Sequence, residues 1–316
     1  MKRVLLIVWS GTGNTLKVAE LIRHSFTVRG WEAEIVDCTR ASAIVAGGAA
    51  AVDTAGSTGA AALTGADVDV ALSAAGIAGD TLARADIVGL GYPVYAFNTP
   101  AAFLRCAKTL PLGDKPVFIF KTSGEPSAPN NGSSHRLIRL SGFRTLLGEY
   151  HFLMPYNIIF RFPDNLVKQM YLAAKRQSGI LADNIITGKT SFIKYGLLHR
   201  LVSWIFRIQG PGARLNGRLY GVRRDRCTLC MRCLRDCPAG NIRLVKGRFR
   251  FGWNCMMCMR CSLYCPADAL RIGLLDLWRV NGPFCFETLE KDETLDGRFI
   301  TGKTRGLYRI YISRLA

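Results

Sequence analysis

Eight of the eleven cysteines fall into two copies of one spacing, with two, two and three residues between successive cysteines and a proline after the last. Two intervening residues allow one tight turn to present three thiolates to three corners of a cube. Thiolates at this spacing hold [4Fe-4S] clusters, whose chemistry is the uptake and release of single electrons. The sequence therefore predicts an electron-transfer protein. The predicted metal ligands are Cys227, Cys230, Cys233, Cys237, Cys255, Cys258, Cys261 and Cys265.

Zinc sites and disulfides are the alternatives for a chain with this many cysteines. Structural zinc favours Cys-x2-4-Cys pairs that lie further apart, whereas each motif here places three cysteines before a Cys-Pro. Disulfides need an oxidising compartment, and the start of the sequence lacks the apolar run and cleavage site of a secretory signal. The spacing therefore favours iron–sulfur clusters. Cys38, Cys106 and Cys285 lie outside the motifs and are expected to be packed thiols.

The region from Asp225 to Ile272 resembles the bacterial two-cluster ferredoxins. In that family the fourth cysteine of each motif ligates the other cluster. The resemblance thus implies one cluster on Cys227, Cys230, Cys233 and Cys265, and a second on Cys255, Cys258, Cys261 and Cys237. Between the motifs we expect a β-hairpin, with strands at 242–245 and 249–251 around a Lys246-Gly247 turn.

A second pattern lies near the N terminus. Residues 4–9 form a continuous apolar run, as expected for a buried parallel strand, and helical spacing follows from Leu16 to Ile22. Between them is Ser10-Gly11-Thr12-Gly13-Asn14-Thr15. A polar, glycine-containing loop at a helix N terminus binds anions through backbone N–H groups. The loop has neither a Walker lysine nor a dinucleotide Gly-x-Gly-x-x-Gly, so the pattern indicates a simple phosphate site.

This loop resembles the flavodoxin phosphate loop, Ser/Thr-x-Thr-Gly-x-Thr, and the resemblance extends over residues 1–163. It implies FMN as a cofactor and a doubly wound α/β fold with a five-stranded parallel sheet in the order 2-1-3-4-5. Two later loops would hold the flavin ring, with Tyr92, Tyr95 and Phe97 as stacking candidates, unless these aromatics only cover the sheet edge. The implied FMN-binding residues are Ser10, Thr12, Gly13, Asn14, Thr15, Tyr92, Pro93, Val94, Tyr95, Phe97, Asn98, Thr122, Ser123 and Gly124.

These patterns divide the chain into four parts. We expect a flavodoxin-like domain over 1–163, with an Ala/Gly-rich insertion at about 41–80, and a helical connecting segment over 164–215. An α+β ferredoxin-like domain should occupy 216–275, before a C-terminal extension over 276–316. Apolar residues at helical spacing in 190–209 predict a helix that packs one domain on the other. Because basic residues interrupt them, a helix on a membrane surface is the alternative.

Charge is distributed unevenly along the sequence. Of the 42 Lys and Arg residues, 28 lie in 161–316, which has only 11 of the 23 Asp and Glu residues. This excess predicts an acidic redox protein as partner, an anionic substrate, or peripheral contact with an anionic membrane. No recognition motif supports nucleic-acid binding. No apolar run is long enough to span a bilayer, and reduced cysteines fit a cytoplasmic location.

As a whole, the chain resembles flavodoxin–ferredoxin fusion proteins of anaerobic bacteria and archaea. The resemblance implies an oxidoreductase that relays electrons between two [4Fe-4S] clusters and FMN and exchanges them with a protein partner. A flavin-dependent reductase of a small organic substrate is one alternative, and an iron–sulfur redox sensor is another. No acid–base pair is evident, so no catalytic side chain is predicted.

Overall fold

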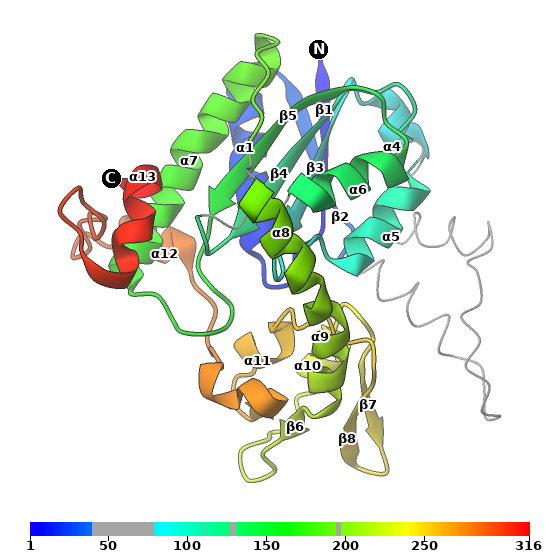
Figure 1. Ribbon diagram of the computed structural model, residues 1–316, viewed down its shortest axis with the longest axis vertical. Coiled ribbons are helices and arrows are strands. Elements are labelled where there is room, and N and C mark those ends of the chain that lie inside the picture. Colours follow the sequence, from blue (N-terminus) through cyan, green and yellow to red (C-terminus); the bar gives the residue numbers. More distant parts are fainter. Residues whose placement is uncertain (40–78, 111, 127–130, 194–196) are drawn as a thin grey trace.

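The computed structural model describes residues 1–39, 79–110, 112–126, 131–193 and 197–316 (Figure 1). The insertion expected at about 41–80 lies outside the described residues, apart from its last two. Within the described part of the chain, no helix is both long and apolar enough to cross a membrane.

Five parallel strands form the main sheet, in the order β2-β1-β3-β4-β5. The order confirms the predicted flavodoxin-like topology, in which ligands bind at the carboxyl ends of the strands. The strands are β1 (Arg3–Val8), β2 (Glu32–Asp37), β3 (Ile87–Pro93), β4 (Val117–Ser123) and β5 (Leu146–Leu153).

Helices cover both faces of this sheet, which explains why β1 is apolar throughout. Alternate residues of a strand point to opposite faces, so Leu6 joins one core and Leu5 the other. One face is covered by α1 (Asn14–Thr27) and α7 (Asp164–Ile186). The other is covered by α4 (Gly79–Arg84), α5 (Ala101–Thr109) and α6 (Asn131–Ser141).

The C-terminal segment returns to the first domain and packs beside α7 (Figure 1). It contains α12 (Phe286–Lys291), η3 (Gly306–Tyr311) and α13 (Ile312–Leu315). The side chain of Gln169 on α7 donates to the carbonyls of Ile300 and Leu315 and accepts from the Ile300 N–H. The Tyr311 hydroxyl donates to the Gly124 carbonyl over 2.6 Å. The tail therefore supports a loop that the sequence assigns to flavin binding.

The cysteine motifs lie in a smaller α+β unit. Its hairpin, β7 (Ile242–Val245) and β8 (Arg248–Phe251), confirms the predicted one and turns through left-handed Lys246 and Gly247. A second strand pair joins β6 (Gly221–Val222) to β9 (Leu270–Arg271). The unit also contains α10 (Arg232–Arg235), α11 (Arg260–Leu263) and η2 (Gly273–Trp278). The segment that leads to it from the first domain contains α8 (Leu197–Ile205), η1 (Phe206–Ile208) and α9 (Gln209–Arg218).

Candidate functional site

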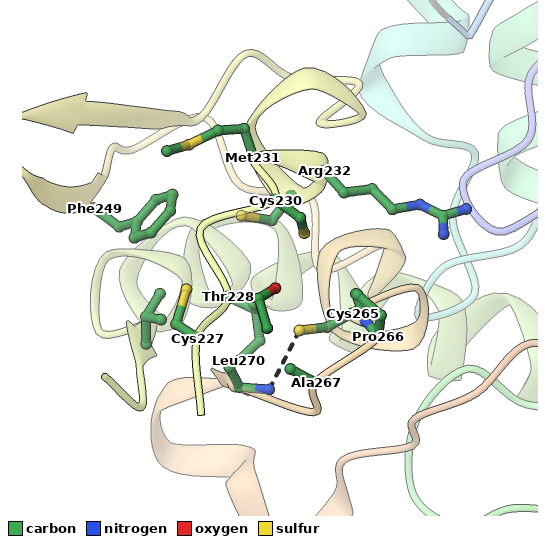
Figure 2. A pocket seen from close by; sticks show the side chains of 13 residues that line it. Cys227, Thr228, Cys230, Met231, Arg232, Phe249, Cys265, Pro266, Ala267 and Leu270 are labelled. Carbon is green, nitrogen blue, oxygen red and sulfur yellow. Dashed lines mark hydrogen bonds between the residues drawn. The ribbon is translucent and has the colours of Figure 1, made fainter. Parts of the chain in front are cut away.

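Three cysteines of the first motif and the last cysteine of the second line one small pocket (Figure 2). They are Cys227, Cys230, Cys233 and Cys265, the four that the crossed arrangement assigns to one cluster. The backbone is left-handed at Leu229 and Met231, two non-glycine positions where this conformation is costly. These turns allow successive thiols to face one cavity, and the Ala269 N–H donates to the Cys265 sulfur over 3.2 Å.

The second motif repeats this backbone conformation at Met257 and Met259. Burial first, and then negative charge on Cys237, raises the pKa of Cys258 to about 12. Burial likewise raises the pKa of Cys255 to about 11, again with Cys237 contributing. Cys237 from the first motif therefore lies among the thiols of the second. Buried thiolates that repel one another need a cation, and the iron of a cluster supplies that charge.

The cysteines of the first group surround a pocket rather than a single point. Across the described residues, no group of three or more Cys, His, Asp or Glu side chains is close enough to hold one metal ion. Backbone N–H groups donate to sulfurs of the second cysteine group, which consists of Cys237, Cys255, Cys258 and Cys261. The Asn241 N–H donates to the Cys237 sulfur over 3.3 Å, and the Met257 N–H donates to the Cys255 sulfur over 3.4 Å. Such hydrogen bonds stabilise a thiolate and tune the potential of a cluster. The donor set thus fits [4Fe-4S] clusters.

Helix α9 covers the second group of cysteines, a role that the sequence did not reveal. A Cβ atom on Gly217 would overlap the Cβ of Cys255, so only glycine permits this approach. The preceding residue of α9, Asn216, donates to the Ile272 carbonyl over 3.0 Å and accepts from the Leu274 N–H over 2.8 Å. These bonds fix α9 against η2 and hold Gly217 in place.

The N-terminal loop has the geometry of an anion site. Gly13 has a φ of +95° and precedes α1, and the Ser10 hydroxyl accepts from the N–H groups of Gly13 and Leu16 over 3.1 and 3.3 Å. The Thr15 hydroxyl lies 2.8 Å from that of Thr122 at the end of β4. Two of the loops predicted to bind FMN therefore meet. Asn14 instead directs its amide to the Pro155 carbonyl, over 2.9 Å.

The second cysteine motif contacts this phosphate loop directly. The Cβ of Cys258 would lie 2.9 Å from a Cβ atom on Gly11, and the Tyr95 hydroxyl would overlap such an atom. Arg260 donates to the Gly11 carbonyl over 3.0 Å. The Tyr264 hydroxyl donates to the Thr12 carbonyl over 2.9 Å. One turn of α11 thus joins the cluster ligands to the loop.

Two buried polar groups at this contact fit a negatively charged ligand. Within the described part of the chain, neither the Tyr95 hydroxyl nor Nε of Arg260 has a hydrogen-bond partner. Burial, followed by the charge of Cys258, raises the pKa of Tyr95 well above its ordinary value, which keeps the hydroxyl a donor. A phosphate would accept from both groups. The residues present therefore fit the phosphate of FMN.

The three aromatic candidates have different environments. Tyr95 reaches the phosphate loop and packs edge-on against Trp9, with ring centroids 5.9 Å apart. Tyr92 is buried beneath α5, where its ring lies 5.3 Å from that of Phe103 and its hydroxyl bonds Ser134. The ring of Tyr92 is therefore part of the core between the sheet and α5. The ring of Phe97 packs 4.6 Å from that of Phe206 in η1.

The loop after β4 is tied to β5 and to the C-terminal tail. The Ser123 hydroxyl lies 2.7 Å from Nε2 of His151, and Gly124 packs against the ring of Tyr156. Among the described residues, Nδ1 of His151 has no hydrogen-bond partner. Burial first, and then the charges of Arg314 and Lys121, hold the pKa of His151 well below its ordinary value. His151 is therefore neutral in the folded protein.

We expect the stability of this protein to fall as the pH drops below about 6.5, the ordinary pKa of histidine. In that range the unfolded His151 gains a proton that the folded one excludes, so the contribution is complete above the unfolded pKa and lost below it. The loss should approach about 1.4 kcal/mol per pH unit. Urea unfolding between neutral and mildly acidic pH measures it, and His151→Gln should flatten the slope. His24→Gln, at an exposed position on α1, is the control. An unchanged slope in His151→Gln would contradict this assignment.

Comparison with known proteins identifies the second domain. Residues 220–266 match the family described as the 4Fe-4S dicluster domain. The chain joins a flavodoxin-like fold to a 4Fe-4S dicluster domain. The family match covers this C-terminal region, while the strand order identifies the fold of the first domain. No curated protein matches the sequence.

Several solved structures resemble the first part of the chain. A short-chain flavodoxin associated with a bacterial microcompartment has 13% identity over 60% of this chain and 99% of its own, with a TM-score of 0.36. An NADH:FMN oxidoreductase has 15% identity over 60% and 89%, with a TM-score of 0.40. A Streptococcus pneumonia TIGR4 flavodoxin has 13% identity over 58% and 98%, with a TM-score of 0.34. At such scores the likeness carries no argument, and the fold assignment depends on the strand order.

Proposed function

We propose that this protein relays electrons between two [4Fe-4S] clusters and FMN and exchanges them with an external redox protein. The observation that carries the proposal is the contact of Cys258, from the second cysteine motif, with Gly11 of the phosphate loop. A ligand of one redox centre thereby touches the loop that would hold the other. A cluster carries one electron and a flavin carries up to two. The pair therefore allows electrons to pass between one-electron and two-electron carriers.

The side chains at this contact have distinct tasks. Arg260 adds a positive charge beside a loop that has no cation of its own, and its guanidinium holds the Gly11 carbonyl. Tyr264 holds the next residue of the loop, Thr12, and the guanidinium of Arg232 lies over its ring at 5.0 Å. These contacts fix the distance between the domains, which favours transfer within one chain over encounter between separate proteins.

The external partner would dock at the first cysteine group, which consists of Cys227, Cys230, Cys233 and Cys265. Its cavity includes Phe249 of the hairpin, and Cys230 is exposed. Lys246, Arg248 and Arg250 are exposed on the same hairpin. A negatively charged redox protein would dock here through long-range attraction that salt weakens. We also propose a cytoplasmic location, where thiols remain reduced.

The relay is tested by anaerobic reconstitution of the full chain with iron, sulfide and FMN, followed by stepwise reduction. We expect the iron and sulfide of two clusters and one FMN per chain, with separate signals in visible and EPR spectra. The titration also gives the order in which the centres accept electrons. Zinc in place of iron, or failure to retain FMN, would refute the relay.

A further inference from the structure

Helix α8 and the segment after it present a row of large apolar side chains to solvent. Leu197 is 81% exposed and Ile208 is 73% exposed, and Leu201, Trp204 and Ile205 between them are each more than half exposed. Relative to Leu197 these positions are i+4, i+7, i+8 and i+11, which is one face of a helix. The apolar row at 190–209 therefore does not simply join the domains, as its spacing predicted.

The other side of the same segment does the packing. Helix α8 lies against α6, and Val202 and Phe206 are half-buried. The ring of Phe206 packs 4.6 Å from that of Phe97. Because this inner face already joins α8 to the first domain, the outer row is not needed to hold the fold together.

The exposed row continues beyond α8. In Figure 1, α8 and α9 run one after the other from the sheet toward the dicluster domain. Leu215 and Leu219 follow Ile208 by seven and eleven residues, and both are at least half exposed. Next to α9, η2 adds Leu274 and Leu277, the latter 97% exposed. Exposed apolar area of this extent marks a surface that contacts something apolar.

The charge along α8, η1 and α9 is of one sign. Residues 184–224 contain eight Lys and Arg residues and no Asp or Glu. Arg214 and Arg218 are exposed on α9, beside Leu215 and Leu219. Carboxylates are thus absent from the stretch of sequence that forms α8, η1 and α9, and the one carboxylate of η2, Asp276, is paired with Arg223. A ligand for this face needs an apolar interior and an anionic surface.

We propose that the face formed by α8, η1, α9 and η2 lies on an anionic lipid membrane. A helix with an apolar face and a cationic remainder lies in the plane of the bilayer interface, with its apolar side chains among the acyl chains. Trp204 lies within the row, and Trp278 at the end of η2 is also exposed. Tryptophan favours this depth of the bilayer. Lipid is favoured over an acidic protein because the row is long and is built mainly from projecting aliphatic side chains.

Flotation of the reconstituted full chain with vesicles tests this proposal. We expect binding to vesicles that contain phosphatidylglycerol, much weaker binding to phosphatidylcholine alone, and a decrease as salt is added. The double variant Trp204→Gln/Ile208→Gln should lower partitioning by at least about tenfold, because it removes two large apolar groups from the interface. Both positions are exposed, so the variant should keep its FMN and clusters.

The matched control is Ile180→Gln/Val28→Gln, which removes two exposed apolar side chains elsewhere on the first domain. It should bind vesicles as the unmodified protein does. Absence of binding to anionic vesicles at low salt would overturn the proposal. Equal binding of the two double variants to vesicles would also overturn it. The same holds if Trp204→Gln/Ile208→Gln loses binding to an acidic redox protein but keeps binding to vesicles.

Discussion

Replacing Gly11 by alanine is expected to separate the dicluster domain from the phosphate loop and to abolish reduction of the flavin by the clusters. The added methyl group would overlap the Tyr95 hydroxyl and come within 2.9 Å of the Cβ of Cys258. Gly11 does not have a positive φ, so the effect comes from this overlap and not from the backbone. Overpacking of this kind costs about 1–3 kcal/mol. Anaerobic stopped-flow absorption measures the flavin reduction, and calorimetry the stability.

A second substitution distinguishes this contact from general damage. Gly11→Ala/Tyr95→Phe removes the overlapping hydroxyl and should recover part of the stability, although Cys258 still limits the space. Gly179→Ala on α7 is the control, since its nearest neighbour, Arg29, would lie 3.5 Å away. Normal flavin reduction in Gly11→Ala would show that the contact is not the route between the centres.

Replacing Cys258 by alanine is expected to remove one cluster and disconnect the other from the flavin. The iron content should fall by about half, because the other set of four thiolates remains complete, with Cys227, Cys230 and Cys233 from the first motif and Cys265 from the second. The surviving cluster should take electrons from a chemical reductant while the flavin stays oxidised. Iron analysis and EPR measure the first effect, and visible absorption of the flavin the second. Cys285→Ala, at an exposed cysteine outside the motifs, should change neither.

The same series tests the crossed assignment of the cysteines. Cys265 shares a cavity with Cys230, although it belongs to the second motif. Cys265→Ala should therefore remove the same EPR signal as Cys230→Ala and leave the signal that Cys258→Ala removes. If Cys265→Ala behaves like Cys258→Ala, each motif holds its own cluster and the crossed arrangement is wrong.

The sequence predicted the sheet order, the hairpin and the two cysteine motifs, because local spacing carries all three. The burial of Tyr92 is also encoded locally. Val88, Leu90 and Tyr92 alternate along β3 and enter the same core, as a period of two requires.

Long-range contacts were not predictable from local patterns. The approach of Cys258 to Gly11 depends on how two separate domains dock, and neither residue type indicates it. The return of Tyr311 to the loop at Gly124 likewise has no signal in spacing or composition. Helical periodicity predicted that the residues of α8 include an apolar face. Other apolar residues, Val202 and Phe206, pack against the first domain instead. Which row faces water was decided by tertiary packing.

Two glycines, one from each domain, press against neighbouring members of the second cysteine group. Gly217 of α9 contacts Cys255, and Gly11 of the phosphate loop contacts Cys258. Neither approach leaves room for a side chain, so the docked protein gives an assembly factor no access from these two directions. Two sides of the second cysteine group are therefore closed by backbone alone, one side by each domain.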